Sequence, residues 1–256
     1  MAVSINSVYK KVLTIANKEQ RGYMTPVQFN LLANQVQQSI FEQYFYDLKQ
    51  ASRVKGNDTN NADHIEILKE KISIFESVNK GDFNIKPVDF YKITDIIYRD
   101  GTVVQHLTRR EYNVVNKNSL TKPSLSNPVY TLQEDYIIDT DLSIAAPGNY
   151  SPWIIIDDGT TLNQNNTYQN INAKYTLYYI RRPKAVKWGY TLVGQSNFTD
   201  TPIYNSQNSI DFELHDSEEY VIVNKILKLF GIMIKDPSLY QLSNAEDVTS
   251  SQNEKQ

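Results

Sequence analysis

The sequence predicts an α+β protein with an N-terminal helical bundle, a central mainly antiparallel β region and C-terminal helices. Apolar residues recur at three- and four-residue steps over the first 80 positions, runs with a period of two begin near Ile85, and helix-start signals return at Asp216. We therefore expect a helical region over residues 1–83, a β-rich region with long loops over 84–208, and C-terminal helices over 209–256 that pack on the N-terminal helices. The 256 residues, 40% of them hydrophobic, suffice for one large core or two small ones.

The first 50 residues predict two amphipathic helices. The first has apolar residues at helical spacing from Ile5 to Ala16 and is expected to end near Arg21 and Gly22. Thr25-Pro26-Val27-Gln28 then has the pattern of a capping box with proline in the first turn. A helix of about 25 residues should follow, because one apolar stripe continues that far. The stripe consists of Phe29, Leu32, Ala33, Val36, Ile40, Phe41, Tyr44, Phe45 and Leu48.

A polar stretch separates these helices from a third. Residues 53–62 are rich in Asn, Asp and Gly and predict a loop. Ile65, Leu68, Ile72 and Phe75 then indicate a third amphipathic helix that ends before Lys80.

The central region predicts short strands. Residues 91–98 and 102–107 are β-rich runs joined by Asp100-Gly101, a strong hairpin signal. Residues 108–116 fit either a short helix or a turn, and prolines separate brief runs such as 136–138 and 153–156. Residues 174–182 alternate as a strand and stop at Pro183.

Helical signals return near the C-terminus, after a predicted loop over residues 193–208. Asp216-Ser217-Glu218-Glu219 has the pattern of a second capping box. The following helix is apolar nearly all round from Val221 to Met233, which favours burial on several sides or between subunits. A further short helix is expected from Asp236 to Val248.

Composition excludes several classes of protein. A net charge of -3 and a pI near 5.7 indicate no overall basic field for nucleic acid or an anionic membrane. The absence of cysteine excludes disulfides and thiolate sites. No stretch matches a signal peptide or a membrane span, so we expect a protein that is made and kept in a reducing cytoplasm.

The sequence predicts no enzyme. His64, His106 and His215 lack metal-ligand spacing, and Asp139-Thr140-Asp141 and Asp157-Asp158-Gly159 fit turns better than a calcium loop. The common hydrolase, P-loop, dinucleotide and zinc-protease motifs are missing. We therefore predict no catalytic, cofactor-binding or metal-binding residues and no cofactor. A muralytic enzyme with two paired carboxylates is the least favoured alternative.

One dense basic cluster consists of Arg181, Arg182, Lys184 and Lys187, next to Trp188 and Tyr190. Basic and aromatic residues together could form a nucleic-acid groove. We favour a positive surface that meets acidic residues of a neighbouring subunit, because residues 209–256 hold nine acidic and four basic side chains.

Two stretches resemble a known group of proteins. The first is VYKKVLTIANKEQRGYMTPVQFNLLANQVQQSIFEQYFYDL, with the turn from Gly22 to Pro26. The second is RRPKAVKWGY together with SIDFELHDSEEYVIVNKILKLFGIMIKDPSL. Both are similar to the ends of virion ring, or head-tail connector, proteins of crAss-like and related podophages, whereas residues 113–172 show no resemblance.

The resemblance implies a structural role in the virion. It implies a homo-oligomeric ring of about a dozen copies at the portal vertex, which extends the DNA channel and docks the tail. The implied partners are the portal protein and other ring or tail proteins, with non-specific contact to packaged DNA and none to a membrane. The alternative from another class is a tail-associated glycan- or receptor-binding module with Trp153 and Trp188 as stacking platforms.

Overall fold

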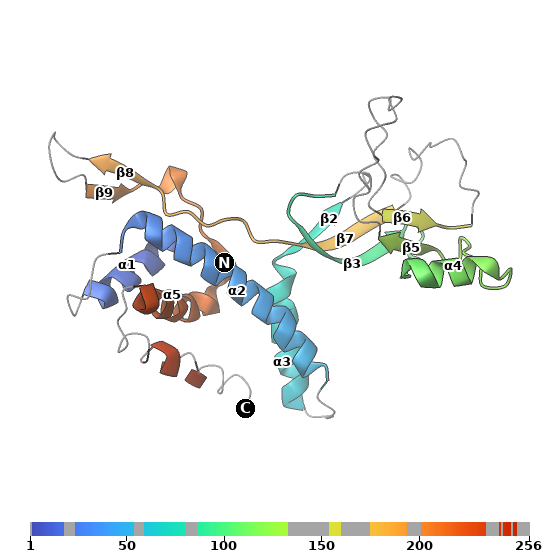
Figure 1. The fold of residues 1–256 in the computed structure, drawn as a ribbon, viewed down its shortest axis with the longest axis horizontal. Helices are drawn as coiled ribbons and strands as arrows, with labels where there is room; N and C mark the ends of the chain where they lie inside the picture. Colours follow the sequence, from blue (N-terminus) through green and yellow to red (C-terminus); the bar gives the residue numbers. More distant parts are fainter. Residues whose placement is uncertain are drawn as a thin grey trace. The chain divides into compact units, whose positions relative to one another are not determined.

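The computed structural model describes residues 2–17, 24–53, 59–79, 86–132, 154–159, 175–193, 201–233, 241, 243–246 and 248–249. Helices and mainly antiparallel sheets occur together, which confirms the α+β class (Figure 1). The chain divides into two compact units. Unit 1 comprises Met1–Ile74 and Pro183–Gln256, and unit 2 comprises Phe75–Arg182. Unit 2 is therefore a continuous insertion in the sequence of unit 1.

Unit 1 contains the two helices predicted at the N-terminus. α1 (Ile5–Asn17) buries Val8, Val12 and Ala16, and its predicted end at Arg21 lies outside the described residues. α2 (Pro26–Ala51) begins with the predicted capping box: the Thr25 hydroxyl accepts a hydrogen bond from the Gln28 backbone N–H, and the Gln28 side chain accepts one from the Thr25 N–H. The predicted stripe is buried from Phe29 to Tyr44.

α3 (Thr59–Ser73) packs against α2 and begins earlier than predicted. Residues 59–62 are helical, so the predicted loop over 53–62 is wrong for these positions. Polar residues such as Asn and Asp are typical of loops but also of the first turn of a helix, and composition alone does not separate the two.

α5 (Glu219–Met233) packs against α1 and α2 and buries Ile222, Ile226 and Phe230. A 3-10 turn, η3 (Asp216–Glu218), precedes it. The predicted cap at Asp216 is wrong, because the side chain of His215 accepts the hydrogen bond from the Ser217 N–H. An imidazole nitrogen one residue earlier therefore takes the role that the sequence pattern assigned to a carboxylate.

Two short sheets complete unit 1. β1 (Ala2–Val3) pairs with β10 (Phe212–His215), and β8 (Tyr190–Val193) pairs with β9 (Thr201–Tyr204), both antiparallel. β9 lies in the range 193–208 that the sequence predicts as a loop. The prediction is wrong there because a strand of four residues is too short to establish a period of two.

Unit 2 contains a three-stranded antiparallel sheet in the order β2-β7-β3. Its members are β2 (Glu76–Asn79), β3 (Phe90–Tyr98) and the central β7 (Tyr175–Arg181). β7 is the strand predicted before Pro183. β2 lies inside the range 1–83 predicted as helical, because its pairing with β7, about 100 residues later, decides its conformation.

The Asp100-Gly101 turn forms as predicted, with Gly101 at φ +95° and the Tyr98 N–H donating to the Thr102 carbonyl oxygen. The expected second strand of this hairpin is reduced to β4 (Gln105–His106), because these residues pair with another sheet. That sheet, β4-β5-β6, contains β5 (Val129–Leu132) and β6 (Ile154–Asp157). The alternative left open for residues 108–116 is decided by α4 (Arg109–Lys117), a helix with its own capping box at Thr108.

Both sheets of unit 2 contribute to one hydrophobic core. The core residues are Ile93, Ile96, Val104, Tyr130, Ile154, Ile156, Tyr175, Leu177 and Tyr179. The predicted strand at residues 136–138, the pair Asp139 and Asp141, and Trp153 lie outside the described residues.

Candidate interaction surfaces

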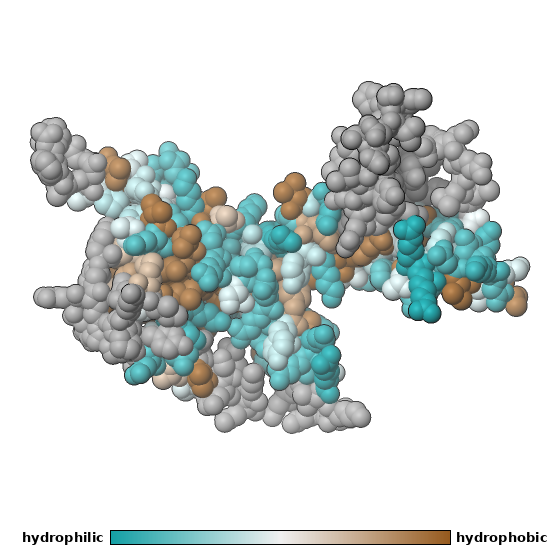
Figure 2. All heavy atoms as spheres, in the orientation of Figure 1, coloured by the Kyte–Doolittle hydropathy of each residue, from teal (hydrophilic) through white to brown (hydrophobic). Residues whose placement is uncertain are grey.

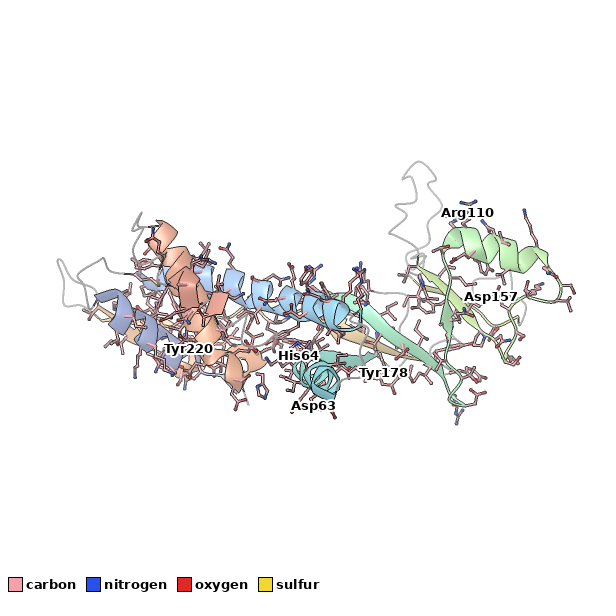
Figure 3. All side chains as sticks on the ribbon, turned by 90° about the horizontal axis from the view of Figure 1, so that it is seen from below. Asp63, His64, Arg110, Asp157, Tyr178 and Tyr220 are labelled. Atoms are coloured by element: carbon pink, nitrogen blue, oxygen red, sulfur yellow. The ribbon has the colours of Figure 1, made fainter. Side chains whose placement is uncertain are left out.

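The three histidines lie on three different elements of the structure. His64 lies on α3 next to Asp63 (Figure 3), the ring of His106 on β4 lies 5.0 Å from that of Tyr130, and His215 caps η3. Among the described residues, no group of three or more His, Asp or Glu side chains could hold a metal ion.

Asp157-Asp158-Gly159 forms a turn at the end of β6. One carboxylate oxygen of Asp157 accepts from the Gly159 N–H at 3.0 Å, and the other accepts from the Tyr112 hydroxyl of α4 at 2.7 Å. Asp158 accepts from the Tyr175 hydroxyl at 3.1 Å. Both carboxylates thus serve turn geometry and packing, and Gly159 has φ +70°, which favours glycine.

These contacts change the ionisation of the two tyrosines. Burial, together with the hydrogen bond to Asp157, raises the pKa of Tyr112 to about 12. Burial and the charge of Asp158 raise the pKa of Tyr175 above its ordinary value. Both phenols therefore remain neutral hydrogen-bond donors over the physiological range.

The predicted basic cluster is divided between the two units. Arg181 and Arg182 belong to unit 2, whereas Lys184 and Lys187 belong to unit 1. The backbone N–H of Lys184 donates to the Glu213 carboxylate at 2.9 Å, so an acidic residue of the same unit already lies beside this part of the cluster.

Trp188 is buried and is not an exposed stacking platform, which corrects the role considered for it. Only 3% of its surface is exposed, and its ring packs against Tyr9, Tyr190 and Tyr204 at centroid distances of 4.1, 5.8 and 5.7 Å. An aromatic ring that already packs against three others has no free face for a sugar or a base.

α2 holds the segment before Trp188 through a row of side-chain amides. Asn30 bonds the backbone N–H and carbonyl of Trp188, and Asn34 bonds those of Val186. Gln37 donates to the Lys184 carbonyl oxygen and accepts from the Glu213 N–H. On its other edge, Lys187 of this segment forms an antiparallel bridge with Ile210. The segment therefore resembles a strand that lies between α2 and a short bridge. The sequence reasoning missed this row, although amides spaced four and three residues apart beside an apolar stripe are a usable signal.

Of the α-helices for which the structure describes every side chain, α4 is the least buried. None of its nine residues is buried, and it is held by its capping box and by the Tyr112–Asp157 hydrogen bond. Val114 on α4 is 65% exposed, and Leu120 just after it is 94% exposed. Figure 2 shows hydrophobic residues at the surface in this part of unit 2, next to hydrophilic ones.

The outward side of α4 is basic. At about 100° per residue, Arg110 and Lys117 fall on the face opposite the half-buried Tyr112 and Val115, and Arg109 falls at the edge of that face. Figure 3 shows Arg110 on the side of the helix away from Asp157. No residue that the structure describes forms an ion pair with these three cations.

No protein-family model matches the sequence, and no curated protein is similar to it. Within the described part of the chain, every helix is too short or too polar to cross a membrane.

Proposed function

We propose that this chain is a structural subunit of a tailed-phage virion, a ring protein in the connector between portal and tail that extends the DNA channel and docks the tail. The observation that carries the proposal is the set of large apolar side chains left uncovered on both units. On α2 of unit 1, Val27 and Leu31 are 64% and 67% exposed, and on unit 2 Val114 and Leu120 are 65% and 94% exposed. Exposed apolar side chains one helical turn apart, as Val27 and Leu31 are, can form the apolar centre of a surface that a protein partner covers.

The division into two units supports the same proposal. Each subunit of a ring must contact neighbours on two sides and other proteins above and below, and two units provide separate surfaces for these contacts. The described polar side chains that could suggest chemistry serve folding instead: Asp157 and Asp158 stabilise a turn, and His215 caps a helix.

Purified protein and intact particles test the proposal together. Light scattering coupled to size-exclusion chromatography and negative-stain microscopy should show closed rings of purified protein. Mass spectrometry and side-chain-resolution microscopy of the virion should place the chain at the portal vertex. A monomer at high concentration that is missing from assembled particles would contradict the proposal, and a monomer retained on a polysaccharide column would favour the glycan-binding alternative.

A further inference from the structure

We infer that the outward face of α4 docks on a second copy of this chain, at the surface around the start of α5. This inference rests on the proposed ring and names the contact that closes it. The docking face consists of Arg110, Val114 and Lys117 on α4, with Arg109 at its edge and the exposed Leu120 just after the helix.

The chemistry of this face favours a protein partner over nucleic acid. Phosphate contacts use basic and polar side chains and need no aliphatic ones. On α4 the cations surround Val114 and precede Leu120, and the core of a protein interface combines arginine with apolar residues in this way. Glu111 is the only acidic residue of α4, and its carboxylate accepts hydrogen bonds from the Thr108 N–H and hydroxyl at 2.8 and 2.7 Å at the N-terminal end of the helix. It therefore does not offset the cations on this face.

The complement of this face occurs on unit 1 of the same chain. Tyr220 at the start of α5 and Val248 are 57% and 48% exposed. The Tyr220 hydroxyl (Figure 3) donates to the Glu246 carboxylate at 3.1 Å, which brings an exposed acid next to an exposed ring. Asp216, four residues before Tyr220, is a second exposed acid. The surface therefore combines apolar groups with negative charge, as the α4 face combines apolar groups with positive charge.

Charge also determines the type of contact. Two α4 faces would repel each other, so a two-fold contact through α4 alone is unfavourable. A positive face that binds a negative face elsewhere on the next copy is a head-to-tail contact, and repeated head-to-tail contacts form rings when the rotation closes.

Charge reversal tests this inference. One variant combines Arg110→Glu with Lys117→Glu, a second combines Asp216→Lys with Glu246→Lys, and a third carries all four substitutions. Each two-site variant alone should assemble at least about tenfold more weakly than wild type, since like charges then meet across the contact. An equimolar mixture of the two, and the four-site variant alone, should regain assembly because opposite charges meet again. Light scattering at 50 mM and 500 mM salt measures assembly, and circular dichroism checks that each variant folds.

A matched control carries Lys10→Glu and Lys69→Glu, which change the net charge as much as the α4 variant at two exposed lysines of unit 1. This control should assemble like wild type. If the α4 variant forms rings as well as wild type, or if the mixture does not regain assembly, the inference is wrong while the proposed function stands. If the α4 variant assembles normally but loses binding to a 30-base-pair duplex DNA, α4 contacts DNA instead. If wild type itself never assembles and is missing from virions, the proposed function fails.

Discussion

Lys71 and Glu218 form the least exposed of the described ion pairs. The Lys71 ammonium nitrogen lies 2.6 Å from a carboxylate oxygen of Glu218, and the side chains of Lys71 and Glu218 are 16% and 6% exposed. The pair joins α3 to the turn before α5. Removing one partner of such a pair costs more than removing both, because a single charge then stays buried without compensation.

We expect Lys71→Met to lower the free energy of unfolding of unit 1 by about 3 kcal/mol or more, because it leaves the Glu218 carboxylate buried and unpaired. Urea denaturation followed by circular dichroism at 222 nm measures the change. The double variant Lys71→Met with Glu218→Leu should recover most of the loss. Equal losses in the single and double variants would show that the ion pair has no energetic role.

Tyr112 is one of the residues of unit 2 whose pKa the fold raises. The pKa of about 12 in the folded protein lies above the ordinary value of 10.0, because burial and the Asp157 hydrogen bond favour the neutral phenol. A raised folded-state pKa contributes stability below pH 10, and this contribution is lost as the pH rises through 12.

The variant Tyr112→Phe should therefore have a lower free energy of unfolding than wild type at neutral pH. Between pH 10 and pH 12, its free energy of unfolding should fall less steeply with pH than that of wild type. Carbon-13 labelling of the tyrosine ring carbon that bears the hydroxyl follows the titration, and the resonance missing in the variant identifies Tyr112. A Tyr112 resonance that titrates near pH 10 would contradict the hydrogen bond.

At the scale of elements, the same capping box begins two helices that differ in burial. Thr25 caps α2, which also buries an apolar stripe, and Thr108 caps α4, which buries no residue. Because packing supplies most helical stability in proteins, α2 has a second source of stability that α4 lacks.

Thr108→Ala and Thr25→Ala therefore form a matched pair. Each should remove about 1 kcal/mol of capping energy, but only α4 should fray. Amide hydrogen exchange of residues 110–117 should accelerate about fivefold or more in Thr108→Ala, while exchange in the middle of α2 should stay unchanged in Thr25→Ala. Unchanged exchange in α4 would mean that the Tyr112–Asp157 hydrogen bond alone maintains the helix.

At the scale of the whole molecule, the two ends of unit 2, which is inserted in the sequence of unit 1, lie side by side. Its first and last strands pair directly, with Glu76 opposite Ile180 and the Arg181 N–H donating to the Phe75 carbonyl oxygen at 2.9 Å. A short linker can therefore replace the insertion without separating the chain ends that it joins.

We expect a variant in which a Gly-Ser linker replaces residues 75–182 to fold as unit 1. It should unfold cooperatively in urea, and Trp188 should keep the blue-shifted fluorescence of a buried indole, since its contacts to Tyr9, Tyr190 and Tyr204 all lie within unit 1. Non-cooperative unfolding, or emission typical of an exposed tryptophan, would show that unit 1 depends on the insertion.

The sequence by itself determined the features that short-range chemistry controls. The capping box at Thr25 and the turn at Asp100-Gly101 depend on residues within a few positions of each other, and the strand before Pro183 depends on local alternation. A local pattern can predict such elements because every group involved lies within the same stretch of chain.

Only the tertiary structure decided the features that distant residues control. β2 is a strand because β7 lies beside it, Trp188 is buried because Tyr9 packs on it, and α4 stays exposed although it contacts β5 and its Tyr112 bonds Asp157 of β6. The candidate docking face follows from the same cause: a helix with an ordinary sequence becomes an interaction surface when its own unit does not cover it. Burial depends on what lies across the fold, and a single sequence contains no local signal for that contact.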